Sequence, residues 1–282
     1  MAKIVVNLMN NLLHSPVERA FYNHIRAHLR NFSKVIDVTQ FANTQHWSMQ
    51  QIMDLYLEVL WDSPEIFYVP KSVQASWEEY SNGTMHFAKL TGIQYAFRQE
   101  EYQQNKSRLD AEVKKAVIYA ARESSPEMIA LRLHDYIVQT CEYDTVAADR
   151  NDLSPQARTI YSVLVRKKAV CEGYTMAYRY LLQKFNIRCE EIVSDVMNHC
   201  WNYVNIRGNW YHVDVTYDDP VFVDETGGLL TKGLNYLSGN SDISRQHFLM
   251  SDVNARRNNY RGWTTKGLPP AVDTFFDNKH WR

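Results

Sequence analysis

The sequence has few of the features that mark membrane proteins, disulfide-stapled proteins or nucleic-acid binders. No run of 18 apolar residues occurs in its 282 residues, so we expect no membrane-spanning helix. The formal net charge of -1 disfavours a nucleic-acid partner, because proteins that bind nucleic acid carry an excess of basic residues. The four cysteines are too few and too scattered for a disulfide framework, and their spacing fits no zinc pattern. The composition therefore predicts a globular protein with no metal and no cofactor.

The first 16 residues do not predict a cellular compartment. They form a short apolar stretch with one Lys, interrupted by three Asn, and no clear small-residue cleavage site follows. This is a poor match to a secretory signal. We expect a cytoplasmic location if this N-terminus is complete, and a secreted or cell-surface location if a leader has been removed.

Local patterns predict a small α+β region over residues 1–122. Capping boxes at Ser15 and Ser48 each start an amphipathic helix. Apolar residues over 65–69 and the alternation over 92–97 predict two strands, and a longer helix follows over 100–122.

The next part of the chain is predicted to be helical first and then to form strands. Helices are expected over 126–141, over 155–165 and from Cys171 to a left-handed Asn186. Strands are expected over residues 188–196, 200–206, 210–217 and, further on, 246–250. The tight connection Arg207-Gly208-Asn209 predicts that the second and third of these strands pair as a hairpin.

Cys171 has the most informative context in the chain. It begins the predicted helix AVCEGYTMAYRYLLQKF, and His199 and Asp214 follow on two consecutive predicted strands. A helix N-terminus favours an anion, and a neighbouring imidazolium lowers the pKa of a thiol, so Cys171 is the predicted thiolate nucleophile. His199 is the predicted base and later acid, and Asp214 is predicted to accept its second ring N–H. Because a hairpin would bring His199 and Asp214 to the same end, the three residues predict attack on amide carbonyls.

Several segments resemble the core of the transglutaminase-like superfamily, a papain-related group of thiol enzymes. They are IALRLHDYIVQTCEYD, TIYSVLVRKKAVCEGYTMAYRYLLQKFNIRCEEIVS, NHCWNYVNIRGNWYHVDVTYDDP and GLNYLSGNSDISRQHFLMSD. The resemblance is to bacterial members, and it implies an α+β fold with a nucleophile helix packed on an antiparallel sheet. It also implies a catalytic core over 123–255, preceded by the α+β region 1–122 and followed by a tail, 256–282, that packs on the core.

The resemblance assigns roles residue by residue. The family's nucleophile falls on Cys171, its His on His199 and its Asp on Asp214. Trp201 matches the aromatic position that accompanies the His, and Tyr161 matches an aromatic position whose hydroxyl would help to bind the oxyanion. Three departures are Cys200, where the family has Ala, Tyr217, where it has Trp, and Asn186, where it has a helix-ending Gly. Strand alternation predicts that Cys200 points away from His199.

Three functions remain open on the sequence alone. The first is thiol acyl transfer on a protein or peptide substrate, resolved either by water, as in a peptidase or amidase, or by an amine acceptor, as in a cross-linking transglutaminase. We favour hydrolysis, because bacterial members of the resembled group look more often like hydrolases. The second is a binding or scaffold module with an idle triad. The third is a metal protein using Cys171, His199, Cys200 and His212, which opposed strand faces disfavour.

Overall fold

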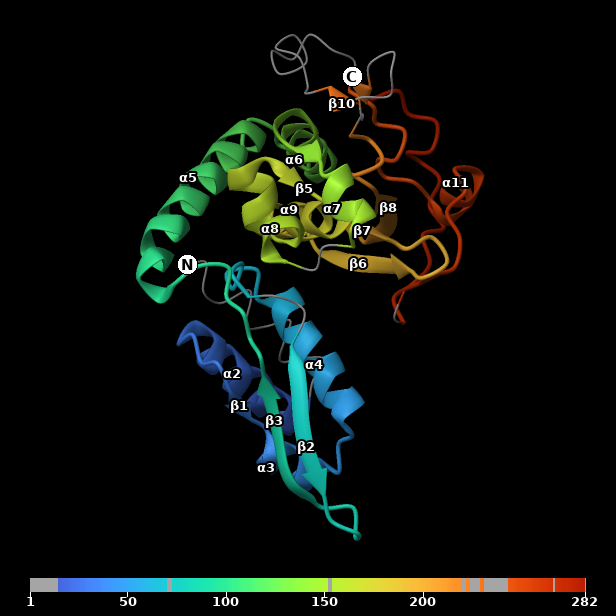
Figure 1. The fold of residues 1–282 in the computed structure, drawn as a ribbon. Coiled ribbons are helices and arrows are strands. Elements are labelled where there is room, and N and C mark those ends of the chain that lie inside the picture. Colours follow the sequence, from blue (N-terminus) through green and yellow to red (C-terminus); the bar gives the residue numbers. More distant parts are fainter. Residues whose placement is uncertain are drawn as a thin grey trace. The chain divides into compact units, whose positions relative to one another are not determined.

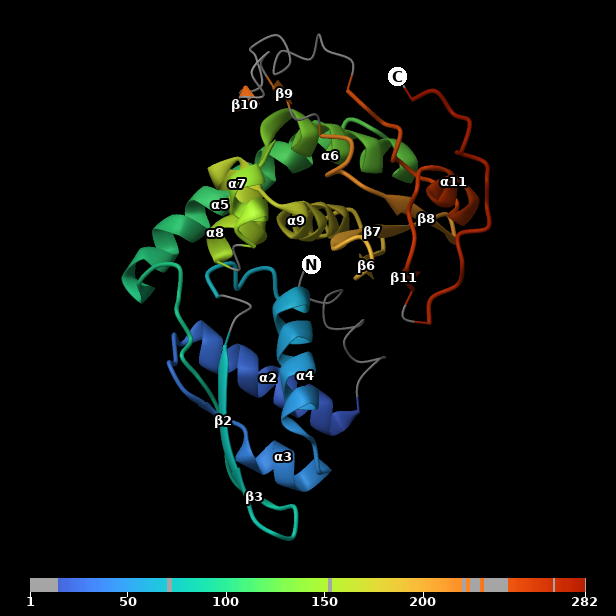
Figure 2. The same cartoon turned by 45° about the vertical axis from the view of Figure 1, so that its right-hand side comes forward.

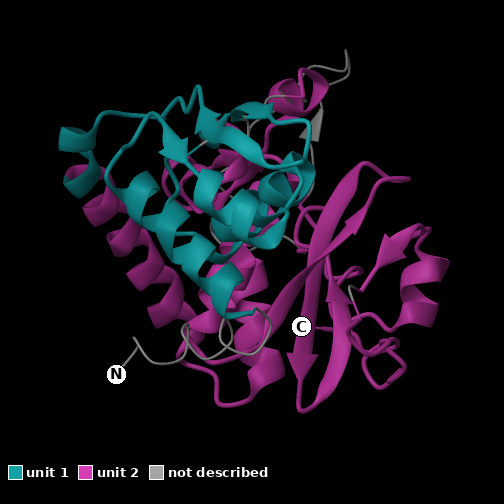
Figure 3. Cartoon of the chain, turned by 90° about the horizontal axis from the view of Figure 1, so that it is seen from below, with its two compact units in different colours: residues 1–103, 153–155 teal, residues 104–152, 156–282 magenta. Residues whose placement is uncertain are grey.

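The computed structural model divides the chain into two units. It describes residues 15–69, 73–151, 154–219, 222–223, 229–230, 243–265 and 267–281. The N-terminal apolar stretch, Pro220 and residues 233–242 of the last family-like segment lie outside the described residues. Unit 1 comprises residues 1–103 with 153–155, and unit 2 comprises residues 104–152 with 156–282 (Figure 3).

Unit 1 is a small α+β assembly (Figure 1). Its described elements are α2 (Pro16–Arg30), β1 (Ile36–Asp37), α3 (Thr39–Gln45), α4 (Met49–Asp62), β2 (Gln74–Glu79), β3 (Met85–Thr91) and η1 (Gln99–Glu101). The strands hydrogen-bond in the antiparallel order β1-β3-β2. Helix α2 packs against α4, and α3 packs against β3. Both predicted capping boxes are confirmed, at Ser15 with Glu18 and at Ser48 with Gln51.

Two strand predictions in unit 1 are wrong. Residues 65–69 form turns, and residues 92–97 are irregular, while the hairpin β2–β3 lies between them around the turn at Gly83. Ile66, Phe67, Tyr68 and Val69 are all buried, so the apolar run at 65–69 marks core packing and not a strand. The alternation at 92–97 likewise reports aromatic packing, since Phe97 contacts the rings of Phe67 and Tyr68.

Unit 2 combines helices with an antiparallel sheet. Its described helices are α5 (Tyr102–Ala120, beginning in unit 1), α6 (Pro126–Thr140), α7 (Thr145–Asp149), α8 (Pro155–Arg158), the π-helix η2 (Ser162–Arg166), α9 (Cys171–Gln183) and α11 (Asp252–Arg257). Its described strands are β4 (Glu142–Tyr143), β5 (Lys168–Ala169), β6 (Cys189–Ser194), β7 (His199–Ile206), β8 (Asn209–Val213), β9 (Phe222–Val223), β10 (Leu229–Leu230) and β11 (Trp263–Thr264). Among the described residues, no helix is long and apolar enough to cross a bilayer.

The sheet of unit 2 separates two faces. Its antiparallel strands lie in the order β11-β6-β7-β8. Helix α9 packs against β6 and β7 on one face and against α6 on its other side (Figure 2). On the opposite face, Trp201 and Tyr203 of β7 form a buried cluster with Ala255, Tyr260 and Ala271 from the C-terminal part. The α+β class with a helix on an antiparallel sheet, predicted from the sequence, is therefore confirmed.

The connections around this sheet follow backbone chemistry. Arg207 and Gly208 both have positive φ, 54° and 92°, as a two-residue hairpin turn requires, and they join β7 to β8. Asn186 is left-handed with φ 56°, just after α9, as predicted. The strand predicted at 246–250 is reduced to a single bridge between Met250 and His212. The His247 backbone N–H donates to the Asp218 carboxylate and not to a neighbouring strand, which interrupts the ladder.

Candidate active site

Cys171 is the first residue of α9, where the sequence predicted a thiol at a helix start. Val170 is the N-cap residue of α9, and its side chain accepts no hydrogen bond from the N–H groups of the first turn. Gly173 allows the preceding chain to approach closely, because a Cβ there would lie 2.9 Å from the Ala169 Cβ and 3.2 Å from the Ala157 carbonyl oxygen. Cys171 as a residue is partly exposed.

His199 begins β7 and is paired with Asp214, which directly follows β8. In the antiparallel register of β7 and β8, Asn202 pairs with Val213. Continued by one residue, this register places Asp214 opposite Trp201 and diagonal to His199, with all three side chains on the same face. His199 Nε2 lies 2.7 Å from Asp214 Oδ2. His199 is also hydrogen-bonded to Cys171, which leaves Nδ1 as the nitrogen that serves the thiol. The structure therefore brings the three predicted residues together in the order thiol, imidazole, carboxylate.

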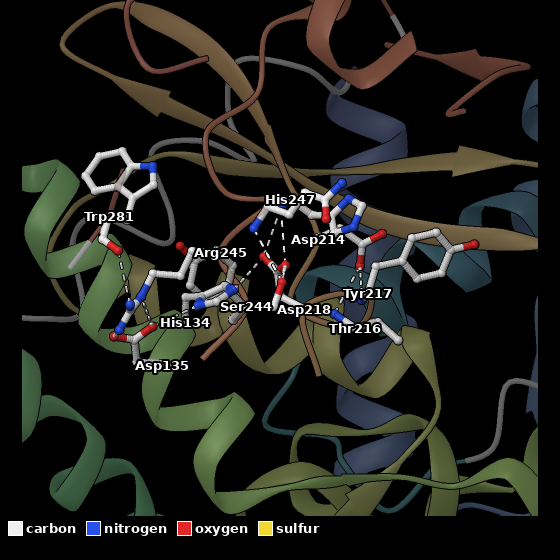
Figure 4. Close-up of polar contacts among 12 residues, drawn as sticks. His134, Asp135, Asp214, Thr216, Tyr217, Asp218, Ser244, Arg245, His247 and Trp281 are labelled. Carbon is white, nitrogen blue, oxygen red and sulfur yellow. Dashed lines mark hydrogen bonds and ion pairs between the residues drawn. The ribbon is translucent and has the colours of Figure 1, made fainter. Parts of the chain in front are cut away.

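Asp214 is fully buried and accepts four hydrogen bonds. Its Oδ1 accepts the backbone N–H groups of Thr216 and Tyr217, at 3.0 and 3.1 Å (Figure 4). Its Oδ2 accepts His199 and the hydroxyl of Tyr260, both at 2.7 Å. Burial raises the pKa of Asp214, but the charge of His199 and these hydrogen bonds outweigh it and hold the pKa below its ordinary value. Asp214 is thus an oriented carboxylate anion.

Cys200 lies on the α9 face of β7. Thr175 Oγ1, one turn above Cys171, lies 2.9 Å from the Cys171 carbonyl oxygen and 3.7 Å from Cys200 Sγ. His199 and Trp201 face the other side of the sheet, as alternation predicts. Helix α9 covers the face on which Cys200 lies. The thiol and the backbone N–H of Cys200 therefore both hydrogen-bond to Cys171. All four cysteines are free thiols.

These neighbours favour a thiolate at Cys171 and an imidazolium at His199. The hydrogen bond from Cys200 and the hydrogen bond and charge of His199 outweigh burial and lower the pKa of Cys171 to about 5. Burial lowers the pKa of His199, but the charge and hydrogen bond of Asp214 and the Cys171 sulfur raise it to about 10. Between these values the ion pair is the dominant form.

Aromatic rings enclose the imidazole of His199. The ring of Tyr217 stacks on it at 4.3 Å between centroids and 8° between planes, and Tyr217 is 46% exposed. The indole of Trp201 lies at 5.7 Å, and its N–H donates to His212 Nδ1. The hydroxyl of Tyr161 donates to Asn105 of α5. The oxyanion or substrate-binding roles of Trp201 and Tyr161 stay predictions.

His212 would be the fourth ligand of the alternative metal site, but both of its ring nitrogens hydrogen-bond to other residues. Its Nδ1 accepts the Trp201 N–H, so its Nε2 carries the proton and donates to Asp252 Oδ1 at 2.9 Å. Burial lowers the pKa of His212, in keeping with a neutral ring. In the part of the chain that the structure describes, no group of three or more His, Cys, Asp or Glu is placed to hold a metal ion.

A family model matches the segment that carries this geometry. Residues 113–215, which include Cys171, His199 and Asp214, match the transglutaminase-like superfamily. This part of the chain is therefore similar to the core of that superfamily. No curated protein matches the sequence.

Three solved structures are similar to parts of this chain. A TGase matches with 15% identity and a TM-score of 0.36 over 51% of this chain and 44% of that one. A candidate cysteine protease from Cytophaga hutchinsonii matches with 15% identity and a TM-score of 0.32, over 56% of this chain and 65% of that one. A candidate protease from Parabacteroides distasonis matches with 11% identity and a TM-score of 0.30, over 51% and 36%. The chain spans less than two thirds of each of them, and likenesses this weak carry no information on activity.

Two residues of this site had no signal in the sequence. Tyr260 lies in an aperiodic stretch 46 positions from Asp214, and His247 lies 13 positions before Tyr260. Their contacts are made through the tertiary fold, so neither spacing nor periodicity could have indicated them.

Selective alkylation of Cys171 is the first expected result. Because its pKa is lowered to about 5, iodoacetamide should react with Cys171 at pH 6 at least about tenfold faster than with the same thiol in the unfolded chain. The alkylation rate should fall as pH drops through about 5, where the thiolate is protonated. Mass spectrometry of the cysteine peptides measures this rate. Cys189 is the internal control, because burial raises its pKa to about 12. Equal, slow labelling of both would contradict a thiolate at Cys171.

Proposed function

We propose that this protein is a cysteine-dependent acyl-transfer enzyme that hydrolyses peptide or glutamine amide bonds. The observation that carries the proposal is the 2.7 Å contact between His199 Nε2 and buried Asp214, with Cys171 hydrogen-bonded to the same imidazole. A thiol, an imidazole and an orienting carboxylate in this order are the parts that nucleophilic acyl transfer requires. The transglutaminase-like family match supports the same class of chemistry.

The proposed first half-reaction forms an acyl-enzyme. The Cys171 thiolate attacks the amide carbon, and the carbonyl oxygen becomes an oxyanion beside the first-turn N–H groups of α9, including that of Cys171. His199 gives its Nδ1 proton to the leaving nitrogen, the C–N bond breaks, and an amine or ammonia departs. A thioester on Cys171 and a neutral imidazole remain, with Asp214 still holding the Nε2 proton.

The second half-reaction returns the enzyme to its starting state. Neutral His199 removes a proton from water, the hydroxide attacks the thioester, and the carboxylic acid product leaves as the thiolate re-forms. We favour water as the acceptor because Cys171 is partly exposed and Tyr217, which covers the imidazole, is 46% exposed. An amine would use the same thioester and give a cross-link instead, so the two reactions differ only in the acceptor.

Trapping the acyl-enzyme tests this function. We would incubate the protein with a library of glutamine-containing peptides, quench with acid, and locate the added mass by peptide mapping. The expected result is a thioester on Cys171, followed in heavy-oxygen water by incorporation of that oxygen into the released acid. A parallel incubation with a tagged primary amine measures the competing reaction: predominant tagging would make the protein a cross-linking enzyme. If neither an adduct nor a product forms with any peptide, while the thiol is reactive, the scaffold alternative is favoured.

A further inference from the structure

Tyr260 contributes a hydroxyl to the innermost part of the site, although it lies beyond α11. Its hydroxyl is 2.7 Å from Asp214 Oδ2, the same oxygen that accepts His199. The side chain is 1% exposed and packs edge-on against Trp201, with 4.9 Å between ring centroids. A buried phenol needs a hydrogen-bond partner, and the nearer of the two for this hydroxyl is the triad carboxylate.

The proton count fixes the direction of each hydrogen bond. Tyr260 has one hydroxyl proton, and ionised Asp214 has none, so the proton lies between them and Tyr260 is the donor. The hydroxyl oxygen is also 3.1 Å from His247 Nδ1. Because the tyrosine proton is already used, His247 must carry a proton on Nδ1 and donate it to the phenol oxygen. The chain of donors therefore runs from His247 through Tyr260 to Asp214.

A buried ionic network holds His247 in this place (Figure 4). The His247 backbone N–H donates to Asp218, and its carbonyl oxygen accepts the Asp214 N–H at 2.9 Å. Asp218 in turn lies 3.1 Å from His134 Nε2, whose Nδ1 lies 3.1 Å from Asp135. Burial lowers the pKa of His134, but its hydrogen bonds to the two carboxylates outweigh this and raise it to about 9. The segment that follows residue 242 is thereby tied to helix α6.

We propose that Tyr260 is a positioning residue that limits how strongly Asp214 holds the proton of His199. This inference rests on the proposed function. His199 and Tyr260 both donate to Asp214 Oδ2. The hydrogen bond from one donor weakens the hydrogen bond that the oxygen accepts from the other. His199 must release its other proton to the leaving nitrogen, and proton transfer slows when the donor acid becomes weaker. The hydroxyl of Tyr260 thus keeps the imidazolium acidic enough to act.

No other described group around Tyr260 replaces this hydroxyl. The titratable side chains that face it are Asp214, Asp218, Tyr217 and His247. The two backbone N–H groups on Asp214 bind Oδ1 and not Oδ2, so they orient the carboxylate whether or not the phenol is present. Removal of the hydroxyl should therefore change the basicity of Oδ2 more than its position.

Tyr260→Phe tests the proposal, with Tyr203→Phe as the matched control. Tyr203 is equally buried in the same cluster, but its hydroxyl donates to the Pro269 carbonyl oxygen and does not contact the triad. For Tyr260→Phe we expect the alkaline limb of kcat to rise by about one pH unit, kcat at neutral pH to fall roughly threefold to tenfold, and KM to stay unchanged. The midpoint of Cys171 alkylation should move to lower pH, because the imidazolium is stabilised.

A second variant tests the sign without removing any contact. Site-specific 3-fluorotyrosine at position 260 keeps the ring and makes the hydroxyl a stronger donor, so both midpoints should move in the direction opposite to Tyr260→Phe. This variant also serves if Tyr260→Phe does not fold. Opposite shifts in the two variants, absent from Tyr203→Phe, support the proposal. Profiles that superimpose on the wild type would overturn it and leave Tyr260 as a packing residue.

The alkylation profile separates failure of this inference from failure of the proposed function. If wild-type Cys171 alkylates rapidly at pH 6 and the variants do not shift it, Tyr260 has no tuning role while the thiolate stands. If wild-type Cys171 is itself unreactive at pH 6, the proposed function fails first, and the tuning role fails with it.

Discussion

Cys171→Ala is expected to remove all measurable turnover while leaving the fold intact. No other described thiol lies where it could form the thioester, because Cys200 reaches the site only as a donor and its pKa is raised by its hydrogen bond to Cys171, burial and the Cys171 charge. Loss of a nucleophile in triads of this kind reduces the rate by at least about a thousandfold. Steady-state assays on the peptide found by trapping measure the loss. The thermal midpoint should change little, since Cys171 is a partly exposed residue and its Cβ remains.

Cys189→Ala is the matched control for this experiment. Cys189 lies on β6 of the same sheet, is fully buried, and is 3.3 Å from the side-chain nitrogen of Asn202. Its removal should cost stability and leave the chemistry in place. If Cys171→Ala keeps the wild-type rate while Cys189→Ala loses it, the nucleophile has been assigned wrongly.

Asp214→Asn is expected to have the next largest effect, and the effect should depend on pH. The charge and hydrogen bond of Asp214 raise the pKa of His199 to about 10, so the neutral amide should bring it down towards its ordinary value. The sign follows: the imidazolium would then be lost as pH rises above neutrality, and the alkaline limb of activity would move down. An amide can also turn its N–H₂ towards His199 and favour the wrong tautomer, so kcat should fall roughly a thousandfold or more.

Asp252→Asn provides a control of the same chemical type. Asp252 accepts a hydrogen bond from His212 on β8, so it forms a second His–Asp pair beside the first. We expect this variant to change the stability of the fold, while the acidic and alkaline limbs of its pH–rate profile have the same midpoints as in the wild type. Equal loss of activity in the two variants, with the same profile, would mean that Asp214 serves the fold and not the imidazole.

The helices and the central chemistry were predictable from the sequence because their causes are local. Ser125 caps α6 and a capping box starts α2, and each signal lies within four residues of the structure it causes. The N-terminus of α9 has no such side-chain cap, and Cys171 was placed there from the amphipathic pattern of the helix that it begins. The hairpin turn at Arg207 and Gly208 then pairs β7 with β8, so His199 and Asp214 come together from local information alone.

The features that could not be predicted depend on which segments meet in space. Alternation correctly put Cys200 and His199 on opposite faces of β7, but it could not show that α9 covers the face of Cys200. The apolar run at 65–69 fits a strand as well as it fits core turns, because periodicity does not distinguish the two in a short segment. The approach of Tyr260 to Asp214 depends on the path of the whole C-terminal part.

The contact between Tyr260 and Asp214 has a practical consequence for dissecting this protein. The family match ends at residue 215, and a fragment cut near that point would still contain the thiol, the imidazole and the carboxylate. It would lack the phenol that shares the carboxylate oxygen and the residues that cover Trp201 and Tyr203. Such a fragment would expose two large rings to water and present an altered acid to the substrate. A weak or insoluble excised core would therefore say little about the catalytic power of the intact chain.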